Sequence, residues 1–156
     1  MRVEHVTTSD MSLRFLLLDQ LRYLRDKGFD VCGISAVGPW ISEIRGAGIP
    51  VTPIPLTRRI TPVADLRALV ALYAHFQRTK PDIVHTHTPK AGLLGQWAAL
   101  AAGVPHRVHT IHGLYLPGGA ASRGRTFYNR HGDWFGWSSI AMTTLLVAQR
   151  IKSSRL

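Results

Sequence analysis

The chain has 156 residues, of which 46% are hydrophobic and 18% charged. This length and composition indicate one globular domain with its own core and exclude a disordered chain. The single cysteine, Cys32, excludes an intramolecular disulfide, and the residues after Met1 do not resemble a secretory signal, so we expect a cytoplasmic protein.

The formal net charge of +10 at pH 7 is unevenly distributed along the chain. Residues 84–156 hold eight basic and one acidic side chain, whereas residues 1–83 hold 11 and eight. A basic half favours phosphates, nucleic acid or an anionic membrane surface, although a compositional bias toward arginine explains it equally well. Because no nucleic-acid-binding module accompanies the charge, we expect no specific nucleic acid partner.

Segments typical of strands and helices alternate along the first 111 residues. β-Branched and apolar runs predict the strands, and apolar residues at three- and four-residue spacing predict the helices. Ser12 is expected to cap the first helix, and Thr88 with Pro89 to begin the fourth. The predicted elements are strand 1–8, helix 13–27, strand 29–36, helix 39–47, strand 49–54, helix 63–78, strand 82–87, a helix from 89 that stops at Gly103, and strand 106–111.

Two of these helices carry a clear apolar side. In the first helix it comprises Leu13, Leu16, Leu17, Leu21 and Leu24, and in the third it comprises Leu66, Leu69, Val70, Tyr73 and Phe76. Alternation of strands and helices predicts an α/β fold with a Rossmann-like, doubly wound parallel sheet. If the strand order is 3-2-1-4-5, loops 8–11 and 86–90 flank one crevice, which is where such sheets bind ligands.

Polar residues gather at the carboxyl ends of the last two predicted strands. Lys90 is in the first turn of a helix, where its ammonium and the free backbone amides suit a phosphate or a carboxylate. Alternatively, Lys90 is a solvated side chain and Gly92 serves helix–sheet packing. His112 offers a hydrogen-bond donor or base toward a sugar hydroxyl or a carboxylate, or else bonds its own backbone. The residues at these two strand ends are Thr86, His87, Thr88 and Lys90, followed by Thr110, His112 and Gly113.

A metal site is the other interpretation of these histidines. His85 and His87 alternate along one strand and share a face, and His109 and His112 end the next strand. Imidazoles are common metal ligands. No carboxylate or second cysteine accompanies them, however, so we expect no metal and favour hydrogen-bonding histidines in a polar crevice.

Several nucleotide and hydrolase motifs are absent from the sequence. The first strand is followed by TTSDMS rather than G-x-G-x-x-G, and neither G-x-x-x-x-G-K-[ST] nor G-x-S-x-G occurs. The sequence therefore lacks the parts for hydride, phosphoryl or acyl transfer by a single domain.

Two longer segments resemble a known family. PDIVHTHTPKAGLLG (81–95) and AALAAGVPHRVHTIHGLY (98–115), with RRITPVADLRAL (58–69) and DQLRYLRDKGFDVCGIS (19–35), are similar to the amino-terminal acceptor domain of family 4 glycosyltransferases of the GT-B fold. The similarity is greatest to the bacterial branch that builds capsule, O-antigen or exopolysaccharide. It predicts a family 4-like domain over 1–130, a divergent or truncated tail over 131–156, and no carboxyl-terminal donor domain.

The resemblance implies a function and a set of site residues. Intact relatives transfer a sugar, with retention, from a nucleotide diphosphate sugar to a polyprenyl-diphosphate-linked glycan, without a cofactor and at the inner face of the plasma membrane. His112 is expected near the transferred sugar as the catalytic residue, and peripheral contact with an anionic membrane is expected. The acceptor side of the cleft would then comprise Ser9, Thr86, His87, Thr88, Lys90, Thr110 and Gly113.

The sequence also departs from the family pattern. Many members have a Gly-Gly pair in the loop after the first strand, where this chain has residues 9–12 (SDMS), and relatives follow FYN with a Glu-Arg pair that is absent here. We expect that a frameshift near residue 130 or later altered the tail and that the chain is inactive alone, which leaves its own enzymatic status open. The alternatives are a non-catalytic Rossmann-like phospholigand-binding module and one subunit of a two-chain glycosyltransferase with a donor-domain partner chain.

Overall fold

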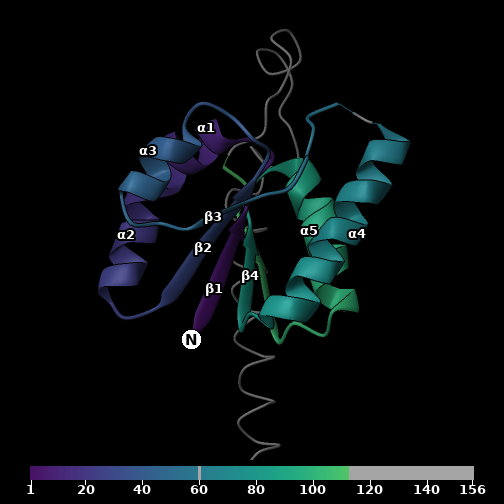
Figure 1. Cartoon of the computed structure of the whole chain (residues 1–156). Helices are drawn as coiled ribbons and strands as arrows, with labels where there is room; N and C mark the ends of the chain where they lie inside the picture. The colour runs from purple at the N-terminus through teal and green to yellow at the C-terminus, as the bar shows by residue number, and fades with distance from the viewer. Residues whose placement is uncertain (60, 113–156) are drawn as a thin grey trace, which may run out of the picture. The chain divides into compact units, whose positions relative to one another are not determined.

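A five-stranded parallel sheet organises the protein. The computed structural model describes residues 1–59 and 61–112. Each neighbouring pair of strands is parallel, in the order β3-β2-β1-β4-β5, which confirms the predicted Rossmann-like sheet (Figure 1). The strands are β1 (Arg2–Val6), β2 (Asp30–Ser35), β3 (Val51–Pro53), β4 (Ile83–Thr86) and β5 (His106–His109).

Helices cover both faces of the sheet, with α1, α2 and α3 on one side and α4 and α5 on the other (Figure 1). None of the helices within the described ranges is both long and apolar enough to cross a membrane. The helices are α1 (Asp10–Ser12), the π-helical turn η1 (Leu13–Leu17), α2 (Leu18–Asp26), α3 (Ile41–Gly46), α4 (Pro62–Thr79) and α5 (Pro89–Ala101).

The first helical segment begins earlier than predicted. It starts at Asp10, and Ser12, the expected cap, lies inside it and makes no capping hydrogen bond. The reason is the buried Asp10 carboxylate, which accepts the backbone N–H groups of Met11 and Trp40, each at 2.8 Å. Asp10 therefore starts the helix and also holds the loop before α3.

The π-helical turn changes which leucines are buried. Leu13 and Leu17, the first and last residues of η1, are buried, whereas Leu16, predicted on the apolar side, is 57% exposed. The wider π-helical turn shifts the buried side of the helix by one residue, so that Leu18 and Leu21 continue this buried side in α2. This side of the core also contains Val31, Ile41, Ile44, Ile49 and Val51.

The core on the opposite face lies between the sheet and α4 and α5. Helix α4 buries Leu72 and Phe76. In contrast, the predicted apolar residues Leu66, Val70 and Tyr73 are exposed, because they lie on the side of α4 that faces away from the sheet. This core consists of Val6, Ile34, Ile54, Leu56, Ala68, Leu72, Phe76, Val84, Ala91, Ala98, Ala99 and Val104.

Candidate functional site

The loops that follow β1 and β4 lie side by side, as the strand order predicts. The His87 N–H donates to the Val6 carbonyl at 3.0 Å, and the Thr8 N–H donates to Thr88 Oγ1 at 3.2 Å. Winding of the sheet reverses between these two strands. The candidate site is therefore at the edge where doubly wound sheets bind their ligands.

One face of the sheet presents histidines at this edge. Val6 and Thr86 face α5, where a Cβ on Gly95 would lie only 2.7 Å from Thr86 Cγ2. Because side chains alternate along a strand, His5, His85 and His87 point to the opposite face. His5 pairs in register with His85 across β1 and β4, which brings the three imidazoles together.

Three imidazoles form a hydrogen-bonded chain that leads outward from the sheet. His5 Nδ1 lies 2.9 Å from His87 Nε2, and His87 Nδ1 lies 3.1 Å from His112 Nε2. His5 is fully buried and His87 is 3% exposed, whereas His112 is exposed. The structure thus connects the predicted catalytic histidine to a residue inside the first strand.

Burial keeps the inner imidazoles neutral. Desolvation, together with a smaller contribution from repulsion by neighbouring imidazoles, lowers the pKa of His5 to about 3, that of His85 to about 4 and that of His87 to about 2. At neutral pH each ring therefore carries one proton, so it donates through one nitrogen and accepts through the other.

In the described part of the chain, the group of side chains that could hold a metal ion consists of His5, His85 and His87. Their ring nitrogens lie within 4.8 Å of one another. His5 and His87 already bond each other, and His85 Nε2 lies 2.7 Å from Thr110 Oγ1. No carboxylate belongs to this group. The expected absence of a metal stays a prediction.

Lys90 is engaged by residues that precede or begin α4, and its assignment to the acceptor side of the cleft stays a prediction. Its ammonium forms an ion pair with Asp65 at 2.5 Å, donates to Thr57 Oγ1 at 2.8 Å and contacts the Arg59 carbonyl. The side chain is 13% exposed, so neither a solvated lysine nor an open anion site describes it. Lys90 instead fastens the segment before α4 to the first turn of α5.

Thr86 and Gly92 serve the packing of α5 on the sheet. Thr86 is fully buried, accepts a hydrogen bond from Gln96 at 2.9 Å and lies 2.8 Å from His109 Nδ1. A Cβ on Gly92 would lie 2.5 Å from Cε1 of His109, so this glycine admits an imidazole rather than a ligand. The assignment of Thr86 to a cleft stays a prediction, and its placement gives it no open side.

The remaining predicted site residues lie around the histidine chain. Thr88 bonds the loop after β1 and makes no capping hydrogen bond, and Thr110 bonds His85. Ser9 Oγ is 3.2 Å from Ser12 Oγ and accepts from Arg58 at 3.3 Å. Gly113 lies outside the described residues.

Sequence reasoning missed His5. The residue is in the β1 segment RVEHV, whose alternation places it on the same face as Val3. In both strands the histidine is the second-to-last residue, so once β1 is predicted to pair with β4, His5 is expected beside His85. Pairing the strands before assigning site residues would have found it.

The family described as glycosyl transferase 4-like domain matches residues 16–145 of this chain. The match extends beyond residue 130, where we expected the family-like part to end. That boundary stays a prediction, because residues 113–156 are outside the described part of the structure.

Two curated relatives are bacterial glycosyltransferases. One is the UDP-Gal:alpha-D-GlcNAc-diphosphoundecaprenol alpha-1,3-galactosyltransferase of Escherichia coli, 49% identical over 59 residues, which are 38% of this chain and 15% of that protein. The other is the capsular polysaccharide biosynthesis glycosyltransferase CapM of Staphylococcus aureus, 35% identical over 115 residues, which are 74% of this chain and 30% of that protein. The chain thus spans less than a third of either relative.

The fold is also found among solved structures. The crystal structure of Anabaena HepE in complex with UDP and glucose matches with a TM-score of 0.59 at 19% identity, over 75% of this chain and 31% of that one. At this identity the likeness concerns the fold alone.

Proposed function

This chain belongs to the glycosyltransferase 4-like family, and on that premise we propose that it supplies the acceptor-side half of a retaining, nucleotide-sugar-dependent glycosyltransferase of bacterial polysaccharide synthesis. The names of the two relatives support capsule and lipid-linked glycan synthesis as the process. The proposed acceptor is a glycan on a polyprenyl diphosphate, and the proposed donor is a nucleotide diphosphate sugar, as UDP and glucose accompany HepE.

The observation that carries this proposal is the position of His112. It lies at the exposed end of the imidazole chain, just after β5 and beside the junction of β1 and β4. An imidazole there can donate to or accept from a sugar hydroxyl without first losing or gaining a proton. We assign His112 the role of contacting the transferred sugar, with Ser9, Thr88 and Thr110 on the acceptor side.

The proposed site needs a second half. Transfer requires a group that holds the nucleotide diphosphate as it leaves, and Lys90 at the start of α5 is already paired with Asp65, while Arg58 donates to Ser9 Oγ at 3.3 Å. We propose that a donor-binding domain, on the same polypeptide or on a partner chain, completes the cleft.

The alternative of a phospholigand-binding module depended on Lys90 at the amino terminus of α5. With its ammonium engaged by Asp65 and Thr57, that site has lost its charged group. A subunit of a two-chain glycosyltransferase remains compatible with the half-site.

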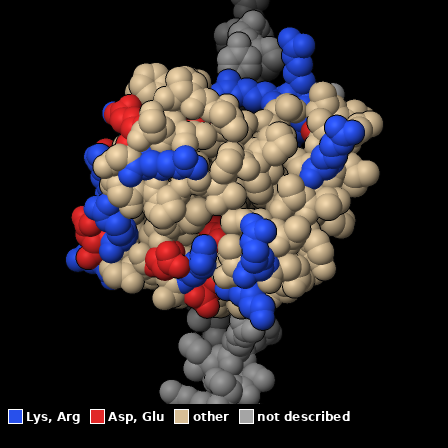
Figure 2. Space-filling model, viewed as in Figure 1, with Lys and Arg blue, Asp and Glu red and all other residues tan. Residues whose placement is uncertain are grey.

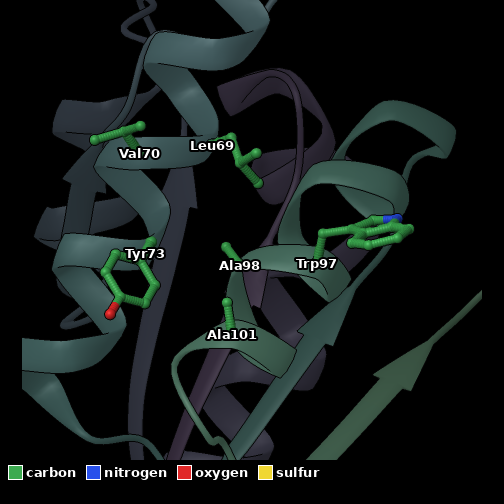
Figure 3. A pocket seen from close by; sticks show the side chains of 6 residues that line it. All are labelled: Leu69, Val70, Tyr73, Trp97, Ala98 and Ala101. Atoms are coloured by element: carbon green, nitrogen blue, oxygen red, sulfur yellow. The ribbon is translucent and has the colours of Figure 1, made fainter.

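We also propose that the outer side of α4 and α5 contacts the membrane that holds the acceptor. A groove between the two helices is lined only by apolar or aromatic side chains, with Trp97 on one side and Tyr73 and Val70 on the other (Figure 3). In Figure 2 this side of the molecule is largely uncharged. The large exposed apolar residues of the two helices are Val63, Leu66, Val70, Tyr73, Leu93, Trp97 and Leu100.

The charges on this face fit anionic lipid. Asp65 is the single carboxylate of α4 and α5, and it is paired with Lys90, whereas Arg67 and Arg78 are exposed. Apolar side chains with a tryptophan between basic residues are typical of surfaces that bind the interface of an anionic bilayer. The enzyme would then work at the inner face of the plasma membrane.

The acceptor role can be tested by binding. The purified chain should bind a short-chain GlcNAc-diphosphopolyprenol analogue by ligand-observed NMR, and His112→Ala should weaken binding about tenfold, the equivalent of about one hydrogen bond. The matched control, His106→Ala on the exposed end of β5, should bind as the wild type does.

The same preparation should not turn over UDP-sugars, because the described residues supply only the acceptor-side half of the proposed site. A folded chain that does not bind the analogue would contradict the acceptor role. Glycosyl transfer by this chain alone would instead refute the need for a second half.

A further inference from the structure

The inner end of the imidazole chain holds a nitrogen without a partner. His5 Nε2 is buried and has no hydrogen-bond partner among the described residues, although Nδ1 of the same ring bonds His87. A buried polar atom in this state is uncommon and constrains the protonation of its neighbours.

A chain of neutral imidazoles has two directions. If His5 carries its proton on Nε2, then His87 donates from Nε2 to His5, and His112 donates from Nε2 to His87. If His5 carries its proton on Nδ1, each bond reverses: His5 donates to His87, and His87 donates from Nδ1 to His112 Nε2. Each direction leaves His112 with a different tautomer.

The burial of His5 distinguishes the two directions. The first direction buries an N–H group that donates to nothing, whereas the second buries only a lone pair. Orphaned buried N–H groups are rarer in proteins than acceptors with unused lone pairs. The second direction is therefore favoured, with the protons of His5 and His87 on Nδ1.

We propose that His5 is a positioning residue that acts through His87 to hold His112 with its proton on Nδ1. His112 Nε2 then accepts from His87, and its Nδ1–H is the atom that faces the ligand. One directional hydrogen-bond network thereby joins residues of three segments, which are β1, the end of β4 and the loop after β5.

The consequence for chemistry rests on the proposed glycosyltransferase function. With Nδ1 protonated, His112 donates a hydrogen bond to an oxygen of the sugar and does not act as the base that removes a proton from it. Specificity at this position would favour a hydroxyl or carbonyl oxygen as acceptor of the bond.

The tautomers can be measured without substrate, so the test is independent of the proposed function. Long-range ¹H–¹⁵N spectra of the whole chain, labelled at histidine and recorded at neutral pH, report which ring nitrogen carries each proton. We expect protons on Nδ1 of His5, His87 and His112. A proton on Nε2 of His112 in the wild type would overturn the proposal.

A matched pair of variants tests the role of His5. His5→Leu removes the donor, so His112 should populate both tautomers. His5→Asn is nearly isosteric with leucine but places an amide N–H close to the original Nδ1 position, so it should restore the Nδ1–H form. A His112 spectrum that is identical in His5→Leu and in the wild type would contradict the proposal.

Two further measurements keep the result interpretable. His85 is on the same face of the sheet but has no hydrogen bond to His5, His87 or His112, and it bonds Thr110 instead. The variant His85→Leu should therefore leave the His112 tautomer unchanged. The second measurement is the zinc content of the purified chain. One retained equivalent of zinc, whose removal by a chelator shifts the histidine signals, would mean that metal bonds stand in place of the N–H···N bonds, and it would refute the proposal.

Discussion

Gly92 illustrates how a single residue sets the distance between α5 and β5. A side chain at this position would overlap the imidazole of His109, which in turn bonds the buried Thr86. For the ring to move away, its bond to Thr86 must be disturbed. Gly92 thus has the role in helix–sheet packing that is one of the interpretations the sequence allows.

We predict that Gly92→Ala destabilises the fold by about 1–3 kcal/mol, as expected when an added methyl group overlaps a neighbouring side chain that must shift. Gly46→Ala is the matched control, because a Cβ at Gly46, also helical, meets no atom within 4 Å. That control should be neutral or stabilising by up to about 1 kcal/mol. Urea unfolding measures both, and equal stabilities of the two variants would contradict the packing role.

At the scale of whole elements, periodicity predicted the strands and helices but not which side of each helix is buried. Leu66, Val70 and Tyr73 form the apolar side of α4 that the sequence indicates, yet they lie outward, and Ala68, Leu72 and Phe76 form the core. A helix with apolar residues on most of its circumference gives no local signal for its orientation. The orientation depends on contacts with α5 and the sheet, which are distant in the sequence.

For the candidate site, the sequence likewise predicted the location but not the partners of every side chain. The meeting of the loops after β1 and β4 followed from strand order, and His87 and His112 lie beside each other there, while their roles stay predictions. The partners of Lys90 were not predictable, because Thr57 and Asp65 are 33 and 25 positions earlier and no pattern links them. Side chains that bond across long sequence separations are the part that required the structure.

The exposed sides of α4 and α5 lead to a prediction about membranes. Trp97 is 63% exposed on α5, beside the groove formed with Tyr73. Trp97→Ala should reduce cosedimentation with vesicles that contain phosphatidylglycerol by several-fold, because the buried apolar area is lost. Tyr23→Ala, an equally exposed aromatic on α2, is the control and should bind as the wild type does.

The lipid composition separates the two contributions to this binding. Vesicles of phosphatidylcholine alone should bind weakly, since they lack the negative charge that attracts Arg67 and Arg78. If Trp97→Ala and the wild type bind anionic vesicles equally, the membrane is not the partner of this face.

At the scale of the whole molecule, the buried histidines couple folding to pH. The pKa of His5, His85 and His87 lies at about 3, about 4 and about 2 in the folded protein, against 6.5 as the ordinary value. Between these values and pH 6.5 the unfolded chain binds protons that the folded chain does not. Stability is therefore complete above pH 6.5 and is lost as the pH falls toward the folded values.

We predict that the free energy of unfolding decreases steeply between pH 6.5 and pH 5, a window in which aspartate and glutamate side chains stay ionised. Each fully coupled histidine contributes up to about 1.4 kcal/mol per pH unit. His85→Leu should reduce the slope by up to one proton, whereas His106→Ala, on the exposed end of β5, should not change it. Urea unfolding at several pH values measures this slope, and a flat profile above pH 5 would show that the imidazoles are protonated within the folded protein.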